Sequence, residues 1–217
     1  GFVDEITMEN HPDHPEMGTR TLHMGNVIYI DREDFMEDPP KKFFRLAPGR
    51  EVRLKGAYII RCDSVVKNES GEIAELHCTA DLDSRSGTEG ANRKVKGTLH
   101  WLSASEAVPC EFRLYEPILS DEDAQAIEAA ESAEDAGEAE ASEAAPAAKD
   151  FMSRLNPNSL TVAQGYCEPC AANAETGSVF QFLRTGYFCK DRDSTPERPV
   201  FNRTVALKDS WAKEAKK

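Results

Sequence analysis

The sequence lacks the motifs of the common nucleotide-binding and zinc-dependent enzymes. Its 217 residues contain no G-x-G-x-x-G, no G-x-x-x-x-G-K-[ST] and no H-E-x-x-H. No apolar run approaches the roughly 20 residues that a membrane-spanning helix needs. These absences leave no recognisable catalytic site and argue against a membrane protein.

The N-terminus also lacks the basic region and the apolar stretch of a secretory signal. Without such a signal, we expect a cytoplasmic protein whose six cysteines stay reduced. The stretch "CEPC" (167–170) is a lone C-x-x-C with no second pair at zinc-ligand spacing, so we predict no metal site. The first residue is Gly rather than Met, which indicates a fragment of a longer chain.

Positive charge is missing from one long stretch. Residues 121–143 hold ten acidic residues and no Lys or Arg. Without those ten charges the formal net charge rises from −13 to −3, so the remainder is nearly neutral and can carry a basic face. The Ala and Glu residues favour helix, but like charges repel along it and little apolar surface is available for packing. We therefore predict a disordered acidic insertion over 120–149.

Strand patterns are abundant in the rest of the chain. "KVKGTLHWLS" (94–103) and "CEFRLYE" (110–116) alternate apolar and polar residues, as half-buried strands do. The stretch 51–67 leads through "NESG" into 72–81, which predicts a long antiparallel hairpin. Many short strands separated by turns predict an all-β fold of antiparallel barrels or sandwiches. Helical turns are expected only at 31–38, with Asp31 as N-cap, and at 103–108.

Basic residues are interleaved with aromatic ones before and within the hairpin. "PPKKFFRL" (39–46) places Lys41, Lys42 and Arg45 around two Phe residues, and "REVRLK" (50–55) adds Lys55 and two Arg residues. This combination suits phosphates and unstacked bases. An ordinary charged barrel surface explains the same pattern, so the composition alone leaves both interpretations open.

The stretch "FQFLRTGYF" (180–188) carries Gln181 and Arg184 three residues apart. In a regular strand, positions three apart point to opposite faces. The two side chains can therefore converge only if the backbone bends or bulges nearby. The alternative interpretation is that Gln181 and Arg184 are simply polar surface residues of a half-buried strand.

Six stretches occur in an order that is typical of one protein family, and they cover nearly the whole chain except the acidic insertion: 10–20, 28–54, 94–116, 155–160, 180–189 and 199–211. Together they resemble the C-terminal half of glutaminyl-tRNA synthetases. The resemblance implies two antiparallel β-barrels of the ribosomal protein L25-like type. It places a proximal barrel at 1–95, completed by returning strands at 196–213, and a distal barrel at 96–195.

The resemblance implies that the chain binds the anticodon loop of glutamine tRNA. The parent protein would be a glutamine–tRNA ligase that uses ATP and Mg²⁺. The family's His-Ile-Gly-His and Lys-Met-Ser-Lys-Ser elements do not occur here. The chain is therefore expected to be non-catalytic, to hold no cofactor, and to act as a monomer with its own N-terminal catalytic domain.

The family's anticodon readers map onto individual residues of this chain. The Gln and Arg of the family's "FQFxR" element correspond to Gln181 and Arg184, and an upstream reader corresponds to Arg45. At four other positions the chain differs from the residue that is typical of the family. Lys42 replaces a Gln, Phe44 replaces a Lys, Lys55 replaces an Arg, and Asp13 replaces an Asn. The expected anticodon-binding residues are Arg45, Gln181, Arg184, Lys42, Lys55 and Lys41.

Three alternatives remain open from the sequence. A non-discriminating glutamyl-tRNA synthetase shares this architecture, and the amino-acid pocket that would distinguish it is not in this chain. A ribosomal RNA-binding protein of the L25 type would account for one barrel only. A protein-interaction module would instead use the acidic stretch.

Overall fold

A computed structural model gives the fold and describes residues 1–119 and 155–207. The chain divides into two compact units. Unit 1 consists of Gly1–Val108 and Cys167–Cys170, and unit 2 of Pro109–Tyr166 and Ala171–Lys217. The predicted acidic insertion at 120–149 lies outside the described residues.

Unit 1 is built from short β-strands and 3-10 turns. The strands are β1 (Asp4–Glu9), β2 (Thr19–Met24), β3 (Ile28–Tyr29), β4 (Glu51–Leu54), β5 (Ile59–Lys67), β6 (Ile73–Asp81), β7 (Thr98–Leu99) and β8 (Leu102–Ser103). The strands β6-β5-β4-β7 form one sheet, and β1-β2 and β3-β8 form two further pairs. The 3-10 turns are η1 (Pro15–Met17), η2 (Arg32–Asp34), η3 (Leu82–Ser84) and η4 (Glu89–Asn92).

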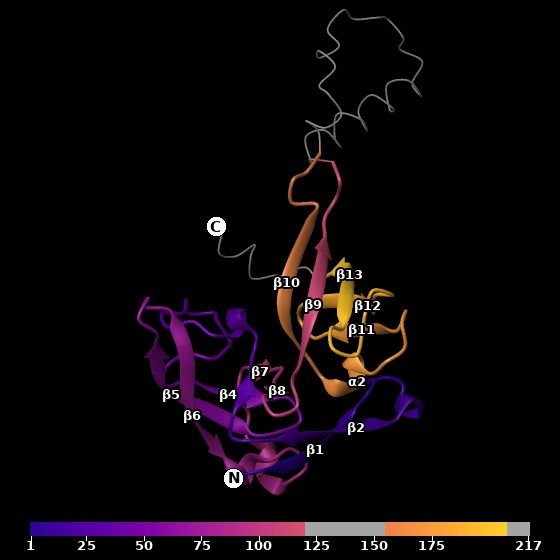
Figure 1. Ribbon diagram of the computed structural model, residues 1–217. Coiled ribbons are helices and arrows are strands. Elements are labelled where there is room, and N and C mark those ends of the chain that lie inside the picture. The colour runs from indigo at the N-terminus through magenta and orange to yellow at the C-terminus, as the bar shows by residue number, and fades with distance from the viewer. Residues whose placement is uncertain (120–154, 208–217) are drawn as a thin grey trace, which may run out of the picture. The chain divides into compact units, whose positions relative to one another are not determined.

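The long hairpin predicted over 51–81 is confirmed, with one change. Strands β5 and β6 are antiparallel and lie side by side in Figure 1, joined by a turn in which Gly71 has φ +79°. The first arm is not continuous, however, because a turn at 55–58 separates β4 from β5. Gly56 allows this turn, since its φ of +71° is a conformation that side chains disfavour.

The core of unit 1 follows the alternation in the sequence. On β1, Ile6 and Met8 are buried while their neighbours are exposed, and Leu99 and Trp101 are buried as the pattern in 94–103 predicts. The indole nitrogen of Trp101 donates to the carbonyl oxygen of Lys55 at 2.9 Å. This hydrogen bond satisfies the one polar group that the ring brings into the core.

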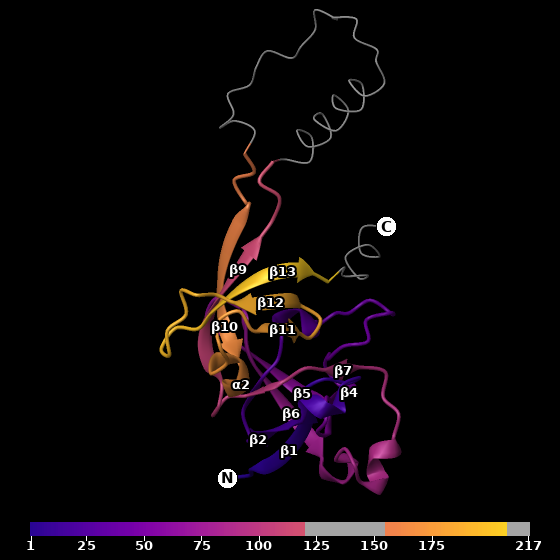
Figure 2. The same cartoon turned by 90° about the vertical axis from the view of Figure 1, so that its right-hand side faces the viewer.

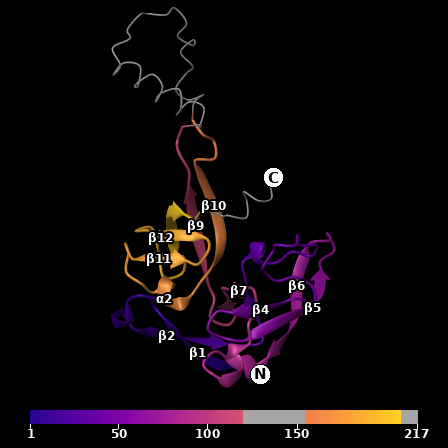
Figure 3. The same cartoon turned by 180° about the vertical axis from the view of Figure 1, so that it is seen from behind.

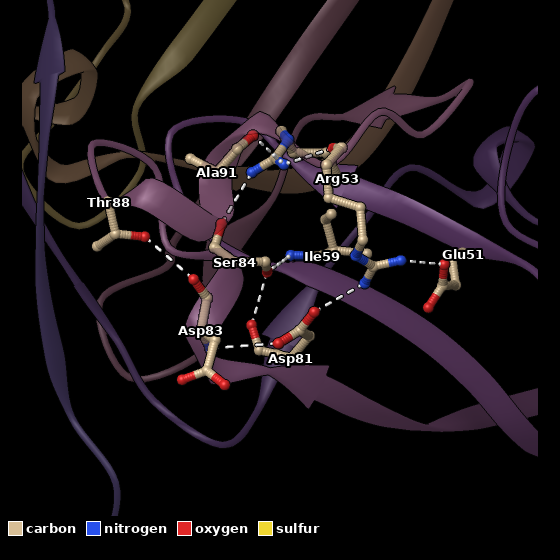
Figure 4. Close-up of polar contacts among 9 residues, drawn as sticks. Glu51, Arg53, Ile59, Asp81, Asp83, Ser84, Thr88 and Ala91 are labelled. Atoms are coloured by element: carbon tan, nitrogen blue, oxygen red, sulfur yellow. Dashed lines mark hydrogen bonds and ion pairs between the residues drawn. The ribbon is translucent and has the colours of Figure 1, made fainter.

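The loop between β6 and β7 is held by side-chain hydrogen bonds rather than by strand pairing. Figure 4 shows the guanidinium group of Arg53 donating to the carbonyl oxygens of Ser84 and Ala91, at 3.0 and 2.9 Å. The hydroxyl of Ser84 accepts from the amide of Ile59 at 2.8 Å. The start of this loop is therefore fixed to the β4–β5 region.

Unit 2 contains one five-stranded sheet, ordered β10-β9-β13-β12-β11. The bounds are β9 (Val108–Tyr115), β10 (Leu160–Cys167), β11 (Val179–Phe182), β12 (Gly186–Lys190) and β13 (Val200–Ala206). The short helix α2 (Pro169–Ala172) follows β10 and belongs to both units, because Cys167–Cys170 are part of unit 1. Figure 2 shows β11, β12 and β13 as neighbouring strands, and Figure 3 shows β9 beside β10. One face of the sheet carries five packed phenylalanines: Phe112, Phe180, Phe182, Phe188 and Phe201.

Several expectations are corrected or stay open. The mostly β content is confirmed, whereas closure of either unit into a barrel stays a prediction. The strands at 196–213 were expected to complete the first barrel. Their described part, β13, pairs with β12 and β9 in unit 2, where Phe201 packs against Phe112, and residues 208–213 lie outside the described residues. The helical turn at 31–38 is a single 3-10 turn, and the Asp31 side chain makes no capping hydrogen bond.

Candidate nucleic-acid interface

The predicted binding residues fall into two groups, each on a different unit. Lys41, Lys42 and Arg45 lie in the loop before β4 of unit 1, and Lys55 lies in the turn after it. Gln181 and Arg184 lie in the β11–β12 region of unit 2.

Lys41 and Lys42 are exposed in a tight turn. The turn is closed by the amide of Phe43, which donates to the carbonyl oxygen of Pro40 at 3.0 Å. Phe43 is 3% exposed, and its own carbonyl oxygen accepts from Arg50 at 2.8 Å. A buried ring thus anchors the turn that presents the two lysines.

Arg45 is less exposed than expected for a surface residue that contacts an RNA base. Its side chain is 15% exposed, and its Nε lies 3.5 Å from Oδ1 of the buried Asp34. Its Nη1 also donates to the carbonyl oxygen of Glu33 at 3.0 Å. The guanidinium group is therefore held in one orientation by Asp34, a partner that no spacing in the sequence indicated.

Phe44 forms a contact that the sequence did not predict. Phe44 is 49% exposed, and Lys96 Nζ lies 5.4 Å from the centroid of its ring. The two segments approach closely, because a Cβ on Gly97 would lie 2.4 Å from the carbonyl oxygen of Phe44. The alternation in 94–103 had placed Lys96 on the polar face of its strand, and this was the one sequence feature that pointed to an exposed lysine there.

Lys55 lies in a hydrogen-bonded turn. Its side chain is exposed, while its amide donates to the carbonyl oxygen of Leu99 at 2.9 Å. Its own carbonyl oxygen accepts the indole hydrogen bond from Trp101. Hydrogen bonds to Leu99 and to the buried Trp101 therefore hold the backbone that carries the Lys55 charge.

The bend that "FQFLRTGYF" requires is present in unit 2. Gln181 is exposed on β11, and Arg184 is exposed in the turn that follows the strand directly. The amide of Thr185 closes this turn on the carbonyl oxygen of Phe182 at 3.0 Å. Arg184 has φ +69° and is the one non-glycine residue with positive φ among residues 1–119 and 155–207. Such backbone strain is more common at functional sites than elsewhere.

The segment Cys167–Cys170 carries one side of an ion pair with Arg20. Glu168 is 9% exposed and receives hydrogen bonds from Arg20 at 2.5 and 3.2 Å, and the thiol of Cys170 contacts it at 3.4 Å. His100 Nε2 lies 4.0 Å from the same carboxylate. Within the described part of the chain, no group of three or more His, Cys, Asp or Glu residues is arranged to hold a metal ion.

The free energy of unfolding is expected to fall as pH drops and His100 becomes protonated. The pKa of His100 lies below its usual 6.5 because burial disfavours the imidazolium; Arg20 and Lys55 lower it further, whereas Glu168 and Asp31 raise it. The unfolded chain therefore takes up a proton near pH 6.5, before the folded chain does, and stability is lost progressively as pH falls from 6.5 toward the lower pKa of the folded chain. Urea unfolding at pH 7.5 and 5.5 should show a smaller loss for His100→Gln than for the unchanged chain. Equal losses would contradict this assignment.

Two sequence-family models match the chain, at residues 1–81 and at 98–191. Both are described as anticodon-binding domains of class I tRNA synthetases for E and Q, that is, glutamate and glutamine. Together they cover both groups of candidate residues.

Curated relatives align over almost the whole chain. Glutamine–tRNA ligase from Nitrobacter hamburgensis is 48% identical over 215 residues, which is 99% of this chain. The ligases from Clostridium perfringens and Escherichia coli O157:H7 are each 44% identical, over 97% and 98% of the chain. In each case the alignment spans 35% of the relative, so the chain corresponds to about a third of those proteins.

Among the helices of the described residues, none is long and apolar enough to cross a membrane.

Proposed function

The chain belongs to the anticodon-binding domains of class I tRNA synthetases for glutamate and glutamine, and we propose that it recognises the anticodon loop of glutamine tRNA. In this proposal, the chain serves a glutamine–tRNA ligase whose ATP-dependent chemistry takes place in an N-terminal catalytic domain of the parent protein. It acts in the cytoplasm as part of a monomeric enzyme.

The observation that carries the proposal is the pair Gln181 and Arg184 at a strained hairpin turn. A Gln amide offers one donor and one acceptor, which can match the edge of a uracil. An Arg guanidinium offers paired donors to a guanine edge or a phosphate. RNA sequence is read on unstacked loop bases, and an exposed hairpin tip suits such bases.

The groups on unit 1 support the same function through different chemistry. Lys41, Lys42 and Lys55 are exposed cations on fixed turns, which suits phosphate contacts without base specificity. Arg45 differs because Asp34 orients its guanidinium group. We therefore assign base recognition to Arg45, Gln181 and Arg184, and phosphate contacts to the lysines.

Glutamine is favoured over glutamate as the amino acid of the parent enzyme. The family description covers both amino acids. The relatives from Nitrobacter hamburgensis, Clostridium perfringens and Escherichia coli O157:H7, at 44–48% identity, are glutamine–tRNA ligases. This similarity supports glutamine, although the residues that select the amino acid belong to the catalytic domain.

Replacing Gln181 by Ala is expected to reduce the discrimination between glutamine tRNA and a variant changed only in the anticodon. The loss should be about 1–3 kcal/mol, the scale of a good bidentate base contact. Gln181 carries no charge, so its effect cannot arise from general attraction to phosphates. Binding of both RNAs at several salt concentrations gives the measurement.

Lys41→Ala is the matched control. It should weaken binding of both RNAs alike and reduce the salt dependence of binding. If Gln181→Ala leaves the preference between the two RNAs intact, Gln181 is only a polar residue on a strand surface.

A further inference from the structure

Tyr187 lies directly opposite Gln181 on the neighbouring strand of unit 2. The antiparallel register of β11 and β12 pairs these two residues, so their side chains share one face of the sheet. Tyr187 is 39% exposed, and Gln181 is exposed as well. The phenylalanines of these strands pack on the opposite face, which leaves the Tyr187 face available to solvent.

The pairing geometry brings the two side chains close together. Along β11 and β12, the amide of Lys190 donates to the carbonyl oxygen of Ser178, and hydrogen-bonded pairs alternate from there. The carbonyl oxygen of Tyr187 instead points toward β13, where it accepts from the Thr204 hydroxyl at 3.1 Å. Gln181 and Tyr187 therefore form a non-hydrogen-bonded pair, the type in which facing side chains are closest.

The same geometry directs the backbone of Gln181 outward. Strand β11 is the outermost strand in the sheet order of unit 2. Since the amide and carbonyl of Gln181 do not face β12, they point toward the outer edge of the sheet. The side-chain amide, a backbone donor, a backbone acceptor and an aromatic ring thus lie at one sheet edge.

We propose that Tyr187 is the stacking partner of the anticodon base that Gln181 contacts. The inference rests on the proposed function and adds a residue to its site. An unstacked base needs a flat apolar surface for its face and polar groups for its edge. Tyr187 supplies the first, and Gln181 supplies the second.

The surroundings of Tyr187 fit a nucleobase in an RNA chain. Val205 pairs with Tyr187 from β13 and is 55% exposed, so the ring continues into an apolar strip. Arg184, in the turn at the end of β11, adds a positive charge near the hairpin tip. An apolar strip with a cation at its end matches a base followed by its phosphate.

The test compares Tyr187→Leu, Tyr187→Phe and Tyr115→Leu in the 217-residue chain. Tyr115 is the matched control because it is 47% exposed on β9, which the sheet order separates from β11. Each variant is titrated with a glutamine tRNA anticodon stem-loop, and with versions in which one anticodon base at a time is removed to leave an abasic site. Circular dichroism and urea midpoints check the fold of each variant.

Tyr187→Leu should weaken binding of the intact stem-loop roughly tenfold, within the range of one base–aromatic stack, whereas Tyr187→Phe and Tyr115→Leu should leave it nearly unchanged. The penalty of Tyr187→Leu should disappear for one abasic RNA, and that RNA should also abolish the penalty of Gln181→Ala. Unchanged affinity in Tyr187→Leu, or a penalty that persists for every abasic RNA, would overturn the inference while the proposed function stands. If the unchanged chain does not distinguish anticodon variants, the proposed function fails and this inference fails with it.

Discussion

Replacing Glu168 by Leu should lower the free energy of unfolding by about 3 kcal/mol or more, because it leaves the partly buried Arg20 without its carboxylate. The two side chains are 21% and 11% exposed, so water screens the pair only in part. Burial opposes the charge on Arg20, but the hydrogen bond and the charge of Glu168 raise its pKa overall. Without Glu168, the guanidinium group of Arg20 keeps the neutral carbonyl oxygen of Glu9 as an acceptor at 2.8 Å but loses the carboxylate that balances its charge.

Urea unfolding followed by tryptophan fluorescence gives the measurement, with Trp211→Phe in every variant so that Trp101, which is 2% exposed in unit 1, is the reporter. The double variant Arg20→Met with Glu168→Leu is the control. Replacing both partners of a buried pair by apolar residues is often neutral, so the double variant should recover most of the loss. If the two single changes and the double change add without coupling, the ion pair is not what holds Cys167–Cys170 to β2.

The parts of the fold that the sequence predicted are those with a strong local signal. Alternation identified the buried face of 94–103, and "NESG" identified the turn of the β5–β6 hairpin. The interruption of the first arm at Gly56 was missed, because a single Gly also occurs inside strands. Local periodicity thus located the strands but not every break in them.

Pairing between distant segments was predicted less well. The strand β13 was expected in the first barrel and pairs in unit 2 instead. Its alternating pattern fixes which face is buried but not which partner buries it. That choice depends on the five-phenylalanine core, whose members are spread from Phe112 to Phe201.

For the candidate site too, the sequence predicted individual residues but not the neighbours that surround them. Identity and order of residues indicated Arg45, Gln181 and Arg184. Their surroundings came only from the fold: Asp34 orients Arg45, and Tyr187 faces Gln181 through strand register. Such neighbours are distant or offset in sequence, and no spacing rule relates Asp34 to Arg45 across a loop.

Replacing Phe188 by Ala should lower the free energy of unfolding of unit 2 by about 3–5 kcal/mol, the usual effect of emptying a buried phenylalanine site. Phe188 is 0% exposed, and its ring centroid lies 5.0 Å from that of Phe182 and 5.5 Å from that of Phe112. Phe182 ends β11, and Phe188 lies on β12. The cavity would therefore loosen the hairpin that carries Gln181 and Arg184.

Hydrogen exchange of the backbone amides across 179–190 measures this effect where it is expected. Protection should fall in Phe188→Ala and remain in Val179→Ala, because Val179 is 65% exposed on the same hairpin and its truncation should change stability by about 0.5 kcal/mol or less. Discrimination between anticodons should decline with the protection of the hairpin, since a reading group is specific only when its backbone is fixed. If Phe188→Ala keeps full protection across 179–190, the aromatic core does not hold the hairpin, and the orientation of Gln181 must depend on other contacts.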